Sequence, residues 1–316
     1  MMLENAKEFL ISYIQKDDKV GIACSGGSDS VALLHFVANC DFISKENIVT
    51  LNVNHKIRGA ESDRDTEFVK KLSDELGVRY LGIEYNVPDA SKQTGKSIEQ
   101  VARDARYTFF SKLIKDGKLK FVMTAHHRED NAESILLNIF RGCGLDGLKG
   151  TKPLRDDGML RPLLTTSKAE INEYIKQNKL KHVDDSSNAD IYFTRNFLRH
   201  EILTRISFRF PNASVALANL AQEANDISSY MEEQLDKSFI NQENENVRLD
   251  LKALENDTLG PRYIRQCLLL SKMRLNTTRK HILLIQDLKN KGSGKQLDLP
   301  GGIVKKGRGF IEFIPN

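Results

Sequence analysis

Short apolar runs and longer amphipathic segments alternate along the first two-thirds of the chain. The apolar runs are typical of buried strands and lie at Val20–Ala23, Ile48–Val53, Tyr80–Tyr85 and Phe121–Ala125. Helical patterns separate them, near residues 61–76, 97–115 and 129–141. This alternation predicts an α/β fold with a parallel, Rossmann-like sheet and helices on both faces. In such a sheet, ligands bind beyond the carboxyl ends of the strands.

The alternation stops after about residue 207. The segment "NASVALANLAQEANDISSYMEEQL" has Ala and Leu at helical spacing, and another helical pattern begins after Pro261. The chain then ends in the Gly-rich, strand-like stretch "LDLPGGIVKKGRGFIEFI". We therefore expect an α/β domain over residues 1–207 and a smaller, mainly helical domain over residues 208–316 that closes with a hairpin.

The sequence "GIACSGGSDSVALLHF", residues 21–36, places a polar loop between a strand and the start of a helix. Glycine allows close approach to the backbone, and the N–H groups at a helix N-terminus attract phosphate. A Walker A loop would need a lysine after Gly27, and a dinucleotide loop would need three spaced glycines. The loop instead matches SGGxDS, the signature of the PP-loop ATP pyrophosphatases. The predicted ATP-binding residues are Ser25, Gly26, Gly27, Ser28, Asp29 and Ser30.

A second polar cluster follows the fourth predicted strand, in "TAHHREDNAESILLNIF". His126, Asp130 and Glu133 recur at i, i+4 and i+7, so they share one helical face. Zinc is a poor fit, because the segment has no HExxH motif and supplies no cysteine ligand. A carboxylate beside phosphates is repelled unless a cation lies between them. We therefore predict that Asp29 and Asp130 hold Mg²⁺.

Two further segments offer side chains to the same crevice. On the predicted helix at 97–115, Arg103 and Arg106 lie one turn apart, and arginine suits phosphate because it donates a planar fork of hydrogen bonds. Arg106 is the stronger candidate. After the second strand, His55 and Arg58 are also candidates, whereas the acidic residues beside them are explained as complements to a helix dipole.

The composition limits the class of protein but does not decide its function. The 316 residues carry a net charge of +4, which permits nucleic-acid binding without demonstrating it. The four cysteines are dispersed, and no signal peptide or long apolar run is present, so we expect a protein of the reducing cytoplasm that does not enter a membrane. Residues 271–309 hold ten Lys and Arg against Asp287 and Asp298, an imbalance that favours contact with a phosphate backbone.

Several blocks in order resemble the tRNA(Ile)-lysidine synthetase family over roughly residues 18–205. Besides the SGGSDS loop they are "NVNHKIRGAESDRD", "IEQVARDARYTFF", "AHHREDNAES", "RGCGLDGLKG", "LRPLL" and "DDSSNADIYFTRNFLRHEIL". The family usually has Asp where Glu129 stands and Gln where Asn131 stands, and both departures keep the polar character. The chain length agrees with the short form of the family, which has one C-terminal domain.

The resemblance implies an ATP-dependent carbon–nitrogen ligase that modifies an isoleucine tRNA with a CAU anticodon. ATP adenylates the C2 oxygen of the wobble cytidine with loss of pyrophosphate, and the ε-amine of L-lysine then displaces AMP. The product, lysidine, pairs with A, so that the tRNA reads AUA as isoleucine. The implied catalytic residues are Asp29, Arg106, His126, Asp130 and Glu133.

Several assignments stay open at this stage. His126 or Glu133 is the candidate base for the attacking amine, and Asp184, Asn188 and Arg195 are candidates for binding lysine or nucleotide. A homodimer is compatible with the sequence, which does not show the oligomeric state. The alternatives are a tRNA thiolation enzyme, which generally needs a CxxC pair or catalytic cysteine, a small-molecule PP-loop ligase, and a nucleotide-binding module without catalysis.

Overall fold

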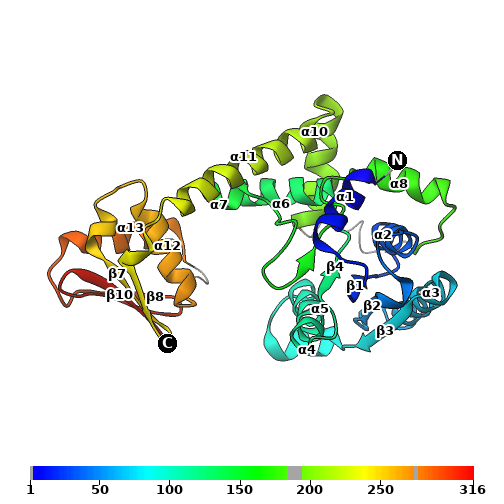
Figure 1. Ribbon diagram of the computed structural model, residues 1–316, viewed down its shortest axis with the longest axis horizontal. Coiled ribbons are helices and arrows are strands. Elements are labelled where there is room, and N and C mark those ends of the chain that lie inside the picture. Colours follow the sequence, from blue (N-terminus) through cyan, green and yellow to red (C-terminus); the bar gives the residue numbers. More distant parts are fainter. Residues whose placement is uncertain (1–2, 184–193, 274–276) are drawn as a thin grey trace. The chain divides into compact units, whose positions relative to one another are not determined.

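The computed structural model describes residues 3–183, 194–273 and 277–316 (Figure 1). The chain divides into two compact units. The first comprises Met1–Gly142 and Lys149–Ala221, and the second comprises Cys143–Leu148 and Gln222–Asn316. Along the described residues, none of the helices combines the length and the apolar character needed to cross a membrane.

The first unit is built on a five-stranded parallel sheet with the strand order β3-β2-β1-β4-β5. Its strands are β1 (Val20–Ala23), β2 (Ile48–Asn54), β3 (Arg79–Glu84), β4 (Phe121–Met123) and β5 (Met159–Leu160). In the central strand, Val20 pairs with Ile48 on one side and with Phe121 on the other. The parallel sheet and the first four strands confirm the prediction, and the two-residue β5 adds an unpredicted edge.

Helices surround this sheet. They are α1 (Glu4–Tyr13), α2 (Ser28–Ala38), α3 (Ala60–Leu76), α4 (Val87–Thr94), α5 (Ile98–Lys115), α6 (Arg128–Phe140), α8 (Lys168–Gln177), α9 (Thr194–Phe197) and α10 (Thr204–Arg209). A π-helical turn, Leu198–Leu203, joins α9 to α10, and α11 (Ala213–Glu233) follows.

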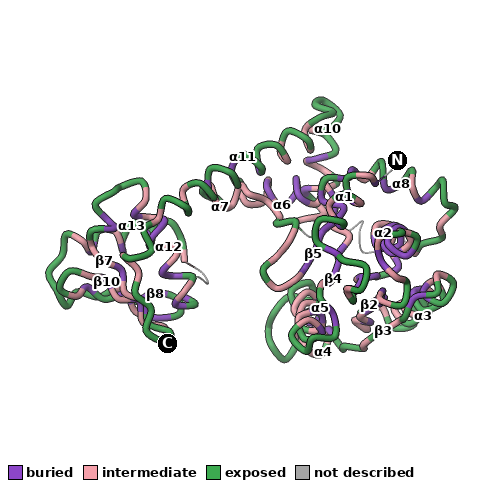
Figure 2. Tube along the Cα trace, in the orientation of Figure 1, coloured by how far each residue is buried: buried purple, intermediate pink, exposed green. Residues whose placement is uncertain are grey.

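Buried side chains form a core on each face of the sheet. One core contains residues of α1, α2 and α8 together with Ile22 of the central strand, and the other contains Phe110 and Leu113 of α5. Successive strand residues alternate between the two cores, since Met123 and Leu160 lie in the first while Val122 and Met159 lie in the second. Figure 2 shows buried positions along α2, whose N-terminus is thereby fixed against the sheet.

The second unit combines helices with a five-stranded antiparallel sheet of order β6-β7-β10-β9-β8. Its elements are α7 (Leu145–Leu148), β6 (Ile240–Glu243), β7 (Asn246–Asp250), α12 (Gly260–Leu270), α13 (Arg279–Asp287), β8 (Gln296–Leu299), β9 (Gly302–Lys306) and β10 (Phe310–Pro315). The predicted helices and the terminal hairpin are present. The hairpin belongs to a larger sheet, so this unit is richer in strand than the sequence indicated.

The close packing around β1 leads to a test of the fold. A Cβ atom on Gly21 would lie 2.6 Å from Leu51 Cδ1 and 2.8 Å from Leu119 Cδ1. Gly21→Ala should therefore overpack the core and lower the free energy of unfolding by about 1–3 kcal/mol. Urea unfolding measures the change. Gly292→Ala is the matched control, because a Cβ there meets nothing within 4 Å. Equal stability of the two variants would contradict the packing described for β1.

Candidate nucleotide site

The loop between β1 and α2 has the shape needed to receive an anion. Gly26 has a φ of +92°, a left-handed conformation that favours glycine, and Gly27 is the extended residue before the first turn of α2. Since Gly27 has no side chain to cap the helix, the N–H groups of the first turn point toward the loop without a side-chain acceptor. The predicted phosphate loop is thus a strand, a turn and a helix N-terminus.

Ser30 holds this loop in shape. Its side chain is buried, and its Oγ donates to the Gly27 carbonyl oxygen at 2.9 Å while accepting the Ser25 N–H at 3.2 Å. The Ser25 Oγ lies 3.3 Å away. The hydroxyl of Ser30 is therefore engaged with the loop backbone, which leaves Ser25, Ser28 and the backbone N–H groups to face a ligand.

The predicted carboxylates Asp29 and Asp130 meet at one histidine. His127 precedes α6, and its Nε2 lies 3.8 Å from Asp29 Oδ2 and 3.5 Å from Asp130 Oδ2. Its Nδ1 lies 3.0 Å from Glu129 Oε2, and its backbone N–H donates to Asp130 Oδ2 at 3.0 Å. Because β1 and β4 are adjacent parallel strands, the loops that follow them bring these three carboxylates around a single imidazole.

The two adjacent histidines have opposite electrostatic environments. Burial lowers the pKa of His127, but the hydrogen bond with Glu129 and the charges of Asp130 and Asp29 outweigh it, and the pKa ends above its usual value. Burial is also the main cause at His126, where the Arg161 and Arg195 charges add to it and lower the pKa to about 3. His126 is therefore neutral at pH 7, and its Nδ1 lies 2.9 Å from Thr124 Oγ1.

Glu133 is the most deeply buried carboxylate of the cluster, with an exposed fraction of 0%. The guanidinium of Arg199 reaches it from the π-helical turn, with Nε 2.5 Å from Glu133 Oε1 and Nη2 2.6 Å from Asp130 Oδ1. Burial raises the pKa of Glu133 above its usual value, although the Arg199 charge lowers it. A buried carboxylate pair that binds a guanidinium can also bind an ammonium group.

Arg195 and Arg199 come from the segment that the sequence left without a definite role. Arg195 Nη2 donates to Ser134 Oγ at 2.9 Å, and its Nε lies 4.0 Å from Glu133 Oε2. The structure thus brings Arg195 to the helix that carries Asp130 and Glu133. The other two candidates from this segment, Asp184 and Asn188, lie outside the described residues.

The predicted arginines of α5 have neighbours outside the carboxylate cluster. Arg106 is exposed, and its charge adds to burial in lowering the pKa of His55, after β2, to about 4. Arg103 stacks on the Tyr107 ring at 4.9 Å, and Arg155 stacks on the same ring at 4.7 Å. Arg106 is therefore placed beside His55, whereas Arg103 belongs to an arginine–tyrosine cluster.

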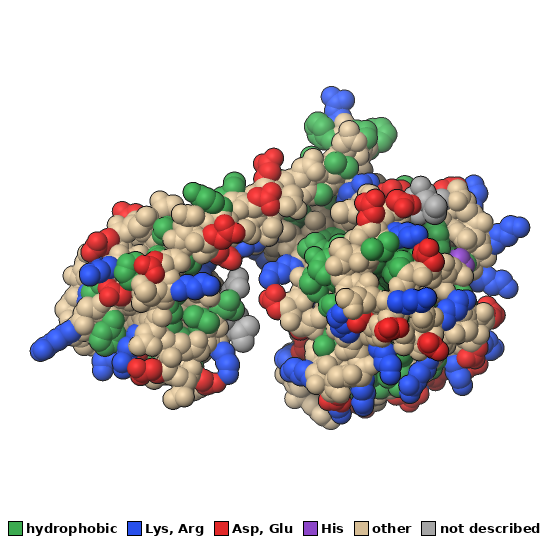
Figure 3. Space-filling model, viewed as in Figure 1, with side chains coloured by type: hydrophobic (Ala, Val, Ile, Leu, Met, Phe, Trp, Pro, Cys, Tyr) green, Lys and Arg blue, Asp and Glu red, His purple; other side chains and the backbone are tan. Residues whose placement is uncertain are grey.

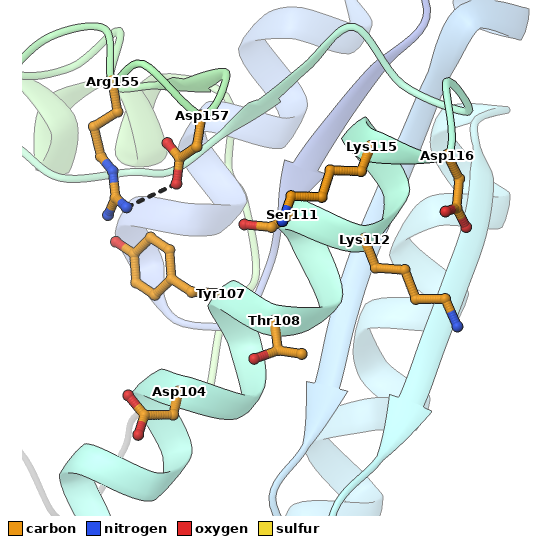
Figure 4. Close-up of a pocket in the computed structure, with 9 residues that line it drawn as sticks. All are labelled: Asp104, Tyr107, Thr108, Ser111, Lys112, Lys115, Asp116, Arg155 and Asp157. Carbon is orange, nitrogen blue, oxygen red and sulfur yellow. Dashed lines mark hydrogen bonds and ion pairs between the residues drawn. The ribbon is translucent and has the colours of Figure 1, made fainter. Parts of the chain in front are cut away.

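A cavity of about 580 Å³ lies next to that cluster, on the outer side of α5 (Figure 4). Side chains of α5 form one wall, and the Arg155–Asp157 ion pair, with an N···O distance of 2.7 Å, forms another. Its lining residues are Asp104, Tyr107, Thr108, Ser111, Lys112, Lys115, Asp116, Arg155 and Asp157. None of them belongs to the phosphate loop or the carboxylate cluster, so we place the candidate site at that loop and cluster and not in this cavity.

Lys168, the first residue of α8, is a site residue that the sequence analysis missed. Its Nζ contacts Asp29 and lies 2.8 Å from Ser28 Oγ, and its backbone N–H donates to Glu129 Oε2 at 2.9 Å. The only sequence signal was the Ser167–Glu170 capping box, which indicates a helix start but no function.

The donor set fits magnesium better than a transition metal. Within the described residues, no group of three or more His, Cys, Asp or Glu side chains is arranged to hold a metal ion. Mg²⁺ does not require such a cage, since it is usually bound by one or two carboxylates together with phosphate oxygens and water. Asp29 and Asp130, which face the same imidazole nitrogen, are a pair of that kind.

Residues 2–206 match the family model described as "PP-loop domain". The chain belongs to the PP-loop family. Its resemblance to tRNA(Ile)-lysidine synthetases is also confirmed. It is 31% identical to tRNA(Ile)-lysidine synthase of Clostridium perfringens, over 93% of this chain and 64% of that protein. It is 36% identical to the synthase of Porphyromonas gingivalis, over 69% of this chain and 47% of that protein. This PP-loop protein thus spans less than two-thirds of either relative.

A solved structure shows the same PP-loop fold. The U34-tRNA thiolase NcsA from Methanococcus maripaludis, with its [4Fe-4S] cluster, superposes with a TM-score of 0.59 over 74% of this chain and 80% of that one. The sequences are 16% identical, so the likeness concerns the fold.

The opposite environments of the adjacent histidines predict opposite titrations. In histidine-selective NMR, assigned with His126→Gln and His127→Gln variants, His127 should titrate above pH 6.5. His126 should stay neutral down to about pH 3 and His55 to about pH 4. Stability contributed by His127 is then present below pH 6.5 and is lost as pH rises through its raised pKa. Titration of both adjacent rings near pH 6.5 would show that the carboxylate cluster is not formed in solution.

Proposed function

We propose that this PP-loop protein ligates L-lysine to C2 of the wobble cytidine in an isoleucine tRNA with a CAU anticodon, and that ATP drives the reaction. The observation that carries the proposal is the meeting of a phosphate loop with Asp29, Asp130 and the buried Glu133 at one edge of the sheet. Its relatives named tRNA(Ile)-lysidine synthase support it. The products are lysidine, AMP and pyrophosphate.

The first step forms a bond between the cytidine C2 oxygen and the α-phosphorus while the α,β-bridging bond breaks. The loop N–H groups with Ser25 and Ser28 would bind the phosphates, and Arg106 would bind the α-phosphate or the adenylate. Asp29 and Asp130 would hold Mg²⁺, which supplies positive charge against the departing pyrophosphate. The N–H groups, the hydroxyls and Arg106 would act directly on the phosphates, whereas the two carboxylates would act through the cation that they hold.

In the second step, the lysine ε-amine attacks C2 and AMP leaves. The amine has a reference pKa near 10.4, so it must lose a proton to react. Glu133 is the better base of the two candidates, since its raised pKa brings it nearer to neutral pH, whereas a pKa of about 3 makes His126 a weak proton acceptor. Asp130 and Glu133, which bind the Arg199 guanidinium, would bind the lysine ammonium before transfer.

Contact with the tRNA backbone is proposed for exposed basic residues of the second unit. Arg279, Lys280, Lys295, Lys305 and Arg308 are exposed. Others of the basic stretch do not contribute, since Lys306 is buried and donates to the Lys289 carbonyl oxygen at 2.6 Å. On the face shown in Figure 3, Lys and Arg side chains are interspersed with acidic ones, so the contact would rest on individual cations more than on one continuous patch.

The cysteines do not favour thiolation chemistry. Cys24 follows β1, Cys40 follows α2, Cys143 precedes α7 and Cys267 lies within α12. Cys24 and Cys267 are buried, and burial raises the pKa of both thiols, to about 12 for Cys267. Such thiols are poor nucleophiles and poor cluster ligands. Lysine ligation needs no cysteine.

We also propose that the protein acts in the cytoplasm, because tRNA, ATP and free lysine are available together there. A homodimer, which the sequence allows, is not required by this scheme, because every proposed residue belongs to one chain.

The direct test is to incubate the protein with ATP, Mg²⁺, radiolabelled lysine and a CAU-bearing isoleucine tRNA transcript. Acid-precipitable label should appear only with ATP and should vanish when the wobble cytidine is replaced by uridine. An Asp130→Ala variant should lose turnover, whereas a mere binding module would have no turnover to lose. Absence of label with folded protein and intact tRNA would refute lysidine synthesis.

The role of Glu133 separates the two partial reactions. Glu133→Gln should slow lysine incorporation roughly 100-fold or more while pyrophosphate release changes little, as expected for loss of a general base. In the unchanged protein, lysine transfer should fall as pH drops through the raised pKa of Glu133, and the variant should lack this limb. Single-turnover assays of pyrophosphate and of labelled lysine measure the two steps. Glu173→Gln, an exposed carboxylate on α8, is the control. Equal slowing of both steps would exclude a base role.

A further inference from the structure

The ammonium of Lys168 lies inside the phosphate loop although its helix is remote in sequence. Nζ contacts two loop residues, Asp29 and Ser28, and Ser28 is 140 positions away. The side chain is 37% exposed, so a ligand in the loop can reach it. It therefore forms part of the loop surface.

Helix α8 is bound by α6 at its N-terminus and by α2 further along, so the position of Lys168 follows from packing. At its N-terminus, Glu129 Oε2 accepts the Lys168 N–H at 2.9 Å and also bonds His127. One and a half turns further, Tyr174 Oη lies 2.8 Å from His35 Nδ1 on α2. Buried Ile171 and Ile175 attach the same helix to the core.

An exposed lysine–aspartate pair is usually incidental and contributes little to stability. Three observations distinguish this one. The ammonium bonds a loop hydroxyl as well as the carboxylate. The backbone N–H of the same residue is bound to the carboxylate cluster. Helix α8 is also hydrogen-bonded to α2, the helix that follows the loop. Several part-buried hydrogen bonds thus position this one cation, which an incidental surface pair would not require.

We propose that Lys168 is a polyphosphate-binding residue that contacts the β- and γ-phosphates of ATP and holds the departing pyrophosphate. The inference rests on the nucleotide site of the proposed function. With ATP bound, Asp29 would be available to hold Mg²⁺, and the Lys168 ammonium would contact phosphate oxygens in place of the carboxylate. As the α,β-bridging bond breaks, the bridging oxygen keeps the electron pair on pyrophosphate, and Lys168 offsets part of that charge.

Calorimetric binding of ATP and of AMP, each with Mg²⁺ and without tRNA, tests the assignment. Lys168→Met should weaken ATP binding roughly ten- to a hundredfold, as expected for loss of a charge-assisted contact, and should leave AMP binding unchanged. Inorganic pyrophosphate should also bind more weakly to the variant. Lys168→Arg should recover part of the ATP affinity. Lys176→Met, an exposed lysine of the same helix, should match the unchanged protein.

Three results would overturn the proposal: equal loss of ATP and AMP affinity, which indicates a structural role; unchanged ATP affinity; or no ATP binding by the unchanged protein, which removes the nucleotide site as well. Circular dichroism of each variant confirms that it is folded. If ATP binding depends on Lys168 but no lysine is transferred to tRNA, the polyphosphate contact stands and only lysidine synthesis fails.

Discussion

Parallel pairing of β1 with both β2 and β4 is the constraint on which the rest of the first unit depends. It fixes Val20 against Ile48 and Phe121, so three chain segments end at one edge of the sheet. The phosphate loop continues from the middle strand, and the histidine-carboxylate segment continues from its neighbour. Because Gly21 has no side chain, Leu51 of β2 and Leu119, which precedes β4, can pack directly against β1.

Charge at that edge is compensated by neighbours from different elements. His127 lies among Asp29, Glu129 and Asp130, and Arg199 neutralises Glu133 from a turn that arrives more than sixty residues later. Because isolated buried charges are costly, each carboxylate here is kept near a cation. A charged group of a ligand can therefore bind to one of these carboxylates or cations only by replacing its present partner.

The sequence sufficed for the framework and for bringing together part of the candidate site. Buried parallel strands are continuous apolar runs, so Ile48–Val53 and Phe121–Ala125 were found almost at their true limits. Asp29 and Asp130 could be paired because both follow neighbouring strands. Lys168 could not be found, since its position depends on the docking of α8. Strand β6 was not predicted, because Asn241 and Gln242 are polar and exposed and give no apolar strand pattern. The sequence also could not show that the pKa of His127 is raised and that of His126 lowered, because both shifts depend on the surrounding charges and burial.

The span between Ser28 and Lys168 also bears on the order of events during folding. The loop and α2 leave the ribosome before α8, so the Lys168 cation can join the loop only after 140 further residues have been made and α8 has packed on α2. Contacts of such long sequence separation form late, because the loop-closure entropy must be overcome first. A nascent chain that has completed only the SGGSDS loop is thus still unable to assemble the whole site. We therefore expect full ligand binding only after the first unit has folded.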